Sequence, residues 1–182
     1  SSYNEILLND DKSQIKLSLR DFGYYFSKVN VQLVELKDKK VDIIFDIDLG
    51  SKAKIKKISF IGDKKFKDGK LRSLIASEEF KFWKIISGKK YLNESLTNLD
   101  KRLLKKYYLN KGYYDVDINS SFAKLLNNDD EFELIFNINA KNKFFFGDLS
   151  IDLPSDFEKD NFTELNKLFD DIKGEPYSIN LV

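Results

Sequence analysis

The chain has 182 residues, of which 14% are aromatic and 34% charged, with 31 basic and 30 acidic side chains. This composition is typical of a folded globular protein and excludes a disordered chain. The lack of cysteine excludes disulfides and thiolate zinc sites, and the lack of histidine excludes serine-type triads and His₃ metal sites.

The first 50 residues predict a helix followed by two strands. Ile15, Leu19 and Phe22 recur at helical spacing, which predicts a helix from about Asp11 to Phe22. A Gly23-Tyr24 pair then ends the helix. The two strands are predicted at residues 31–36 and 41–47, on either side of a charged turn.

The next stretch begins a second set of elements. A strand is predicted at Ile55–Ile61, and Gly62-Asp63 turns the chain after it. Asp68 is a candidate N-cap for a short helix that contains Leu71, Leu74 and Ile75. An irregular segment from Glu79 to Lys90 follows this helix.

A long helix begins near residue 93 and ends at Gly112. Asn93 can cap its first turn, because its side chain can accept a hydrogen bond from a backbone N–H that has no helical partner. Gly112 occupies the position where a left-handed residue usually ends a helix. The spacing predicts one buried stripe, formed by Leu92, Leu96, Leu99, Leu103 and Tyr107.

The same helix-to-strand turn occurs twice. Gly112-Tyr113 repeats Gly23-Tyr24 after 89 residues, and two strands follow each turn, here at 120–126 and 132–138. A further strand is predicted at 144–153, in the place that Ile55–Ile61 has in the previous set, and a helix at about 157–172. An internal period of about 90 residues is typical of tandem domains.

The full repeat has the order strand, helix, helix, strand, strand, which predicts an α+β fold. Its residues resemble POTRA domains (polypeptide-transport-associated modules), above all those of the BamA family of outer-membrane protein assembly factors. The resemblance rests on three segments. They are the run Phe82-Trp83-Lys84-Ile85-Ile86-Ser87-Gly88-Lys89-Lys90-Tyr91, the strand Ile58-Ser59-Phe60-Ile61-Gly62, and the turn Tyr107-Tyr108-Leu109-Asn110-Lys111-Gly112-Tyr113.

The resemblance implies tandem POTRA modules, each β-α-α-β-β with two helices packed on a three-stranded mixed sheet. Residues 1–50 would be the C-terminal part of a second POTRA domain, 52–140 a complete third domain, and 143–182 the N-terminal part of a fourth. The turns formed by Gly23, Tyr24, Gly112 and Tyr113 would be structural elements of these domains.

The function implied is that of a non-enzymatic scaffold on the periplasmic face of the bacterial outer membrane. Its partners would be accessory lipoproteins, including a BamB-like propeller at the complete domain, and unfolded outer-membrane β-barrel proteins bound by β-augmentation. A membrane-embedded barrel would follow these domains in the full-length protein. No cofactor, metal or nucleic acid is expected.

Two alternatives remain open at this stage. The chain could be the POTRA region of another outer-membrane transporter, of the two-partner secretion or translocation-and-assembly type. It could also be a small α+β RNA-binding module, because residues 51–90 carry 13 basic against 4 acidic side chains, a net charge of +9. The simpler interpretation of that basic block is lysines that solvate the outside of strands and helices.

The candidate binding site is the edge of the sheet in the complete domain. By the resemblance, the first strand of the hairpin forms this edge, the strand after it is central, and the contacting residues fall at Asn119, Ala123 and Leu125. Ser121 belongs to the same edge strand; the alternative is that Ser121, Ala123 and Leu125 form one face of an ordinary strand. A second candidate is the apolar loop containing Phe82, Trp83, Ile85 and Ile86. That loop either docks a partner or closes the core beneath the helices.

Two acidic clusters are further candidate sites. Asp129-Asp130-Glu131 and Asp170-Asp171 could form a carboxylate pair or bind calcium. Both lie at predicted turns or helix ends, where acidic side chains usually cap and solvate. They are therefore interpreted as structural.

Overall fold

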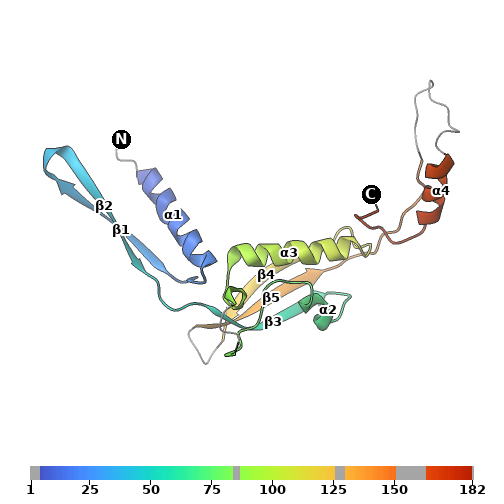
Figure 1. The fold of residues 1–182 in the computed structure, drawn as a ribbon, viewed down its shortest axis with the longest axis horizontal. Coiled ribbons are helices and arrows are strands. Elements are labelled where there is room, and N and C mark those ends of the chain that lie inside the picture. Colours follow the sequence, from blue (N-terminus) through green and yellow to red (C-terminus); the bar gives the residue numbers. More distant parts are fainter. Residues whose placement is uncertain (1–4, 84–86, 126–129, 151–162, 182) are drawn as a thin grey trace, which may run out of the picture.

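The computed structural model describes residues 5–83, 87–125, 130–150 and 163–181. The elements are arranged along one long axis, with the N-terminal helix and hairpin at one end, a three-stranded sheet in the middle and the C-terminal helix at the other end (Figure 1). The molecule is therefore elongated and is not one compact globule.

The N-terminal part consists of α1 (Glu5–Asp21), β1 (Lys28–Leu36) and β2 (Lys40–Asp48). The two strands pair antiparallel around the short 3-10 helix η1 (Lys37–Lys39), which occupies the predicted charged turn. The helix begins before the predicted start at residue 11, and Leu8 in its added turns is buried.

The central part has a mixed sheet. β3 (Lys54–Asp63) is parallel to β5 (Glu131–Asn139), and β4 (Asp117–Lys124) is antiparallel to β5, so the strand order is β3-β5-β4. The helices α2 (Asp68–Arg72) and α3 (Glu94–Leu109) lie between β3 and β4 in the sequence, with the 3-10 turn η2 (Gly88–Lys90) between them. This order and the mixed sheet confirm the predicted β-α-α-β-β fold.

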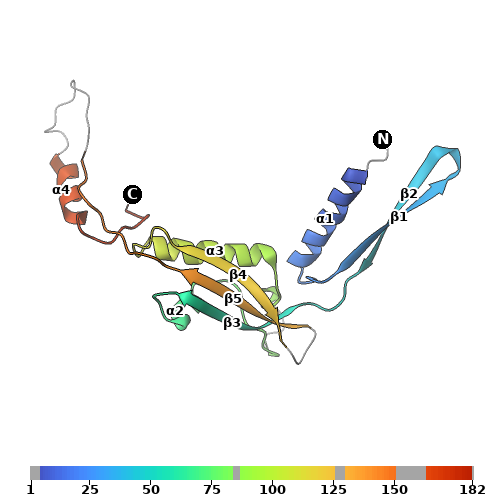
Figure 2. The ribbon, with the colours of Figure 1, turned by 180° about the vertical axis from the view of Figure 1, so that it is seen from behind.

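Both helices pack on one face of this sheet. Every second residue of β5 is buried, and these residues form one core with Leu71 of α2 and with Leu104 and Tyr108 of α3. Figure 2, which views the molecule from behind, shows α3 running along the sheet. The other face of the sheet has no helix over it in the described chain.

The buried stripe of α3 differs from the predicted one. The fully buried residues are Asp100, Leu104 and Tyr108, each one position beyond a predicted leucine or tyrosine. Helical spacing of apolar residues predicts the stripe with Leu99 and Leu103, because the stripe that is buried contains the charged residue Asp100. The predicted cap is correct, because Oδ1 of Asn93 accepts a hydrogen bond of 2.7 Å from the N–H of Leu96.

The predicted cap of α2 is wrong. Lys67 is the residue that precedes this helix, and Asp68 lies inside its first turn, where a negative charge favours the helix dipole. The carboxylate of Asp68 forms an ion pair with Lys64, four residues earlier, instead of bonding the helix backbone.

The two repeated glycine turns form the joints along the chain. Gly23 has a φ of 90° and Gly112 a φ of 91°, as the helix-to-strand turn requires. The carbonyl of Gly23 accepts a hydrogen bond of 3.0 Å from the N–H of Ala53, and that of Gly112 one of 2.7 Å from Phe144. Each turn glycine is thus bonded to the segment that begins the next set of elements.

The C-terminal part contains α4 (Thr163–Ile172). The predicted strand at 144–153 is wrong over residues 144–150, where Phe145 forms only an isolated bridge with Pro176. Three backbone hydrogen bonds of 2.9 to 3.0 Å join residues 144–146 to residues 174–177, and this pairing is too short to form a strand. Residues 151–153, and the first part of the predicted helix, lie outside the described residues.

Candidate functional site

The β3 edge of the central sheet is closed by side chains and loop backbone. The N–H of Ile58 donates a hydrogen bond of 3.0 Å to Oε1 of Glu79, and its carbonyl accepts one of 2.7 Å from Arg72. The N–H of Phe80 donates one of 2.6 Å to the carbonyl of Ile55. An incoming strand could pair here only after these bonds had been broken.

The β4 edge is different. Leu125, just beyond β4, donates a backbone hydrogen bond of 2.9 Å to Glu131, so these two residues form a hydrogen-bonded pair of the antiparallel ladder. Such pairs alternate with pairs whose N–H and C=O groups point away from the partner strand. The backbone groups of Ile118, Ser120 and Phe122 therefore point outward, and no backbone partner for them is found among the described residues.

The expected edge position of β4 is confirmed by the strand order. The backbone groups of the four predicted contact residues, however, point inward to β5, while their side chains lie on the helix-free face. They are Asn119, Ser121, Ala123 and Leu125. Their role in binding stays a prediction, but the groups that could pair with a partner strand belong to the residues between them.

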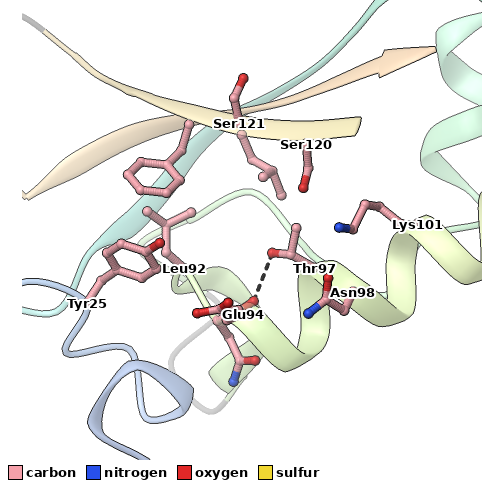
Figure 3. Close-up of a pocket in the computed structure, with 11 residues that line it drawn as sticks. Tyr25, Leu92, Glu94, Thr97, Asn98, Lys101, Ser120 and Ser121 are labelled. Atoms are coloured by element: carbon pink, nitrogen blue, oxygen red, sulfur yellow. Dashed lines mark hydrogen bonds between the residues drawn. The ribbon is translucent and has the colours of Figure 1, made fainter. Parts of the chain in front are cut away.

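A groove of about 230 Å³ lies between β4 and the first turns of α3. Its walls include Leu92, Thr97 and Lys101 on the α3 side and Ser120 on β4, and Figure 3 shows the Ser120 side chain pointing into it while Ser121 points away. Tyr25, from the joint after α1, also lines the groove.

Aromatic rings connect the groove to the N-terminal part. The ring of Phe122 lies edge-on to that of Tyr25, with 4.7 Å between their centroids. Phe26 stacks on Phe132 of β5 at 5.0 Å. Tyr25 and Phe122 were not among the predicted site residues, although the repeated Gly-Tyr-Tyr turn is a sequence signal for the first of them.

The second candidate site is only partly described. Phe82 is 80% exposed and Trp83 63% exposed, with 4.6 Å between their ring centroids. These two rings therefore do not close the core beneath the helices. Ile85 and Ile86 lie outside the described residues.

Many charges of the basic block are paired. Three lysines of β3 form ion pairs, at 2.6 to 3.2 Å, with acidic residues on β5 or just before it. The pairs are Lys54–Asp130, Lys56–Glu131 and Lys57–Glu133. The hydrogen bond from Ser59, together with Lys57, lowers the pKa of the Glu133 carboxyl below its usual value. The ion pairs support the interpretation of Asp130 and Glu131 as structural residues. Asp129, the third member of that acidic cluster, lies outside the described residues.

The described part of the chain contains no group of three or more residues placed to hold a metal ion. None of its helices is both long and apolar enough to pass through a membrane.

Comparisons with known proteins place this geometry in a family. Residues 53–141 match the family model named POTRA, described as a surface antigen variable number repeat. The chain is 25% identical to the outer membrane protein assembly factor BamA of Buchnera aphidicola over 144 residues, which are 79% of this chain and 23% of that protein. It is 28% identical to BamA of Neisseria meningitidis over 116 residues, which are 64% of this chain and 15% of that protein.

Two solved structures are also similar. The crystal structure of Haemophilus ducreyi BamA lacking POTRA domains 1–3 matches with a TM-score of 0.58 and 26% identity, over 78% of this chain and 24% of that one. The Haemophilus influenzae structure of BamA POTRA domains 3–5 matches all of this chain and 67% of that one, with a TM-score of 0.57 and 14% identity, which supports the fold alone.

The chain spans less than a quarter of the length of these curated relatives. The matches nevertheless confirm the resemblance that the repeat and its motifs indicated. Residues 53–141 belong to the POTRA family, and the chain is homologous to part of the outer membrane protein assembly factor BamA.

Proposed function

We propose that this chain is part of the periplasmic scaffold of an outer-membrane protein assembly machinery. In this role it binds accessory lipoproteins, including a BamB-like propeller, and unfolded outer-membrane β-barrel precursors. The homology to BamA supports the scaffold role, which involves no catalysis and no cofactor. The partners are those that the family resemblance implies, and the binding mode proposed next gives a way to hold them.

The observation that carries the proposal is the contrast between the two sheet edges. At β3, Glu79, Arg72 and Phe80 already occupy backbone groups that a partner strand would need. At β4, the outward N–H and C=O groups of Ile118, Ser120 and Phe122 have no backbone partner among the described residues, and they lie beside the groove. An extended chain added to this edge would be held by backbone hydrogen bonds, which tolerate many client sequences.

We also propose that residues 1–50 and 143–182 are parts of the neighbouring POTRA domains, with 52–140 as the complete one. The two equivalent joints support this division. Gly23 and Gly112 share one backbone conformation, and each carbonyl accepts a hydrogen bond from the start of the next segment. The segments are therefore in contact at their joints.

The alternatives have less support. Two-partner secretion and translocation-type transporters also carry POTRA domains, but the relatives reported above are assembly factors. An RNA-binding module would use free basic side chains in residues 51–90, and six of the 13 basic residues there form ion pairs. They are Lys54, Lys56, Lys57, Lys64, Lys65 and Arg72. Phe60, in the same block, is buried in the core.

The test is a proline at an outward position of β4. Ser120→Pro removes an outward N–H but leaves the ladder to β5 intact, so the protein should fold. In pull-downs with the full-length protein, it should lose both the propeller lipoprotein and an unfolded β-barrel precursor. Ser120→Ala is the matched control, because it removes the hydroxyl group and keeps the N–H, and it should bind as the wild type does.

A second variant tests the residue carried over from the family. Leu125→Asp adds a charge at the end of the edge, where an apolar contact is expected, and should reduce the pull-down while leaving the circular dichroism spectrum intact. If folded Ser120→Pro and Leu125→Asp proteins both bind fully, the site lies elsewhere, with the loop at residues 82–86 as the next candidate.

A further inference from the structure

The space beside β4 has two chemically different ends. The groove of about 230 Å³ lies beside Ser120 and Phe122, near the C-terminal end of the strand. A second hollow of about 430 Å³ lies beside Val116 and Ile118, where the strand begins. Lys101 of α3 lines both, so the two hollows form one continuous surface along the edge.

The first hollow has four apolar or aromatic residues in its lining, beside polar ones from α3 and β4 that include Glu94 and Lys101. The four are Tyr25, Leu92, Phe122 and Leu134; the leucines are buried behind the aromatic pair of Tyr25 and Phe122, and Phe122 is 38% exposed. A side chain that enters here meets aromatic and aliphatic surface, and burying apolar area is favourable by roughly 25 cal/mol per Å². This end therefore suits an apolar or aromatic side chain.

The second hollow is basic. Lys101, Arg102 and Lys105 line it from α3, and none of them forms an ion pair within the described chain. The one acid in its lining is Asp117, which accepts a hydrogen bond of 3.1 Å from Asn119. Glu94, at the far end of α3, pairs with Arg20 at 3.6 Å. Three bases facing one acid leave this end with net positive charge.

We infer that the β4 groove selects an extended segment carrying an apolar or aromatic side chain and an acidic side chain four residues apart. Side chains on one face of a strand repeat every two residues, and four residues span about 13 Å at about 3.3 Å each. That is the separation of Phe122 from Ile118 along the edge, so the apolar side chain enters the first hollow and the acid meets the basic one. The inference rests on the proposed function, since it needs a strand added to β4.

Synthetic peptides test this selectivity directly. The first is a short blocked peptide of alternating threonine and serine, with one phenylalanine and, four residues later, one glutamate. The second replaces the glutamate with lysine, and the third moves the glutamate by one position, to the opposite face. Each is also made with the two residues in reverse order, because a strand can pair in either direction. Titration of the whole chain, followed by amide chemical shifts, gives the affinities.

The glutamate peptide should bind about three- to ten-fold more tightly than the lysine and displaced-glutamate peptides, with a difference that shrinks at high salt. In the Lys101→Glu/Lys105→Glu protein the preference should reverse toward the lysine peptide. Lys67→Glu, on the exposed residue before α2, is the control for the added charge and should keep the original preference.

The failures are distinguishable. If all peptides bind alike and Ser120→Pro abolishes their binding, the edge docks strands but does not select by charge, and the inference is wrong while the proposed function stands. If no peptide binds, or sedimentation shows that a second copy of the chain fills the groove, both are wrong.

Discussion

The carboxylate of Asp100, in the middle of α3, accepts a hydrogen bond of 2.6 Å from the backbone N–H of Ala76, in the loop after α2. The same carboxylate accepts weaker bonds of 3.3 Å from the N–H of Ser77. Asp100 is completely buried. One buried acid thus fixes the loop between the two helices onto the helix that forms a wall of the groove.

Removing this carboxylate should destabilise the protein. Asp100→Ala leaves buried N–H groups without an acceptor, which costs about 1–3 kcal/mol of unfolding free energy. Asp100→Asn keeps one acceptor oxygen and should lose less. Urea unfolding measures both, and equal stability of the alanine variant and the wild type would show that the bond to Ala76 contributes nothing.

The same residue predicts a pH dependence. Burial raises the pKa of Asp100 above its ordinary value, although the hydrogen bonds from Ser77 and Ala76 oppose this shift. The folded state then holds a proton that the unfolded state has lost, so the contribution to stability is fully present below about pH 3.9 and is lost as the pH rises through the raised pKa. The wild type should therefore gain stability relative to Asp100→Asn as the pH falls through that window. A constant difference would contradict the raised pKa.

The turn glycine of the second joint allows a test of backbone conformation. With a φ of 91°, a side chain at Gly112 is strained, and its Cβ would come within 2.8 Å of the Phe144 carbonyl oxygen. Gly112→Val should cost about 1–2 kcal/mol or more. Gly147→Val is the matched control, because a Cβ there meets nothing within 4 Å and should change the melting temperature little.

The exposed aromatic pair can be tested by its own fluorescence. Trp83 is the only tryptophan and is 63% exposed, so its emission should lie at the wavelength of a solvated indole and be quenched efficiently by acrylamide. Phe82→Ser/Trp83→Ser should change the unfolding free energy by no more than about 0.5 kcal/mol. A blue-shifted emission with a large loss of stability would mean that these rings close the core.

Local patterns predict most of the fold, and the failures have physical causes. The 89-residue repeat places five strands and both glycine turns correctly, because alternation and positive φ are set by neighbours in the sequence. The α3 stripe is displaced because the buried Asp100 is stabilised by Ala76, a contact no local pattern contains. The predicted strand at 144–150 fails because its pairing with residues 174–177 extends only over residues 144–146, which the local apolar pattern does not reveal.

The candidate site, too, is predicted only as far as local patterns and the fold determine it. The sequence and the family resemblance place the edge strand correctly, because the strand order comes with the fold. They do not reveal which residues of β4 turn their backbone outward, since this depends on the register with β5, as the pair formed by Leu125 and Glu131 shows. Tyr25 reaches the groove from another part of the chain, which spacing along one element cannot indicate.

The measurement that tests the β4 edge most directly is residue-resolved amide hydrogen exchange, with and without a bound partner. In the free protein, Ile118, Ser120 and Phe122 should exchange quickly, while Asn119, Ser121 and Ala123, bonded to β5, should exchange slowly. Addition of the propeller lipoprotein or an unfolded precursor should slow the first three and leave the β3 edge unchanged. Partner binding that leaves the amides of Ile118, Ser120 and Phe122 in fast exchange would contradict strand addition at β4.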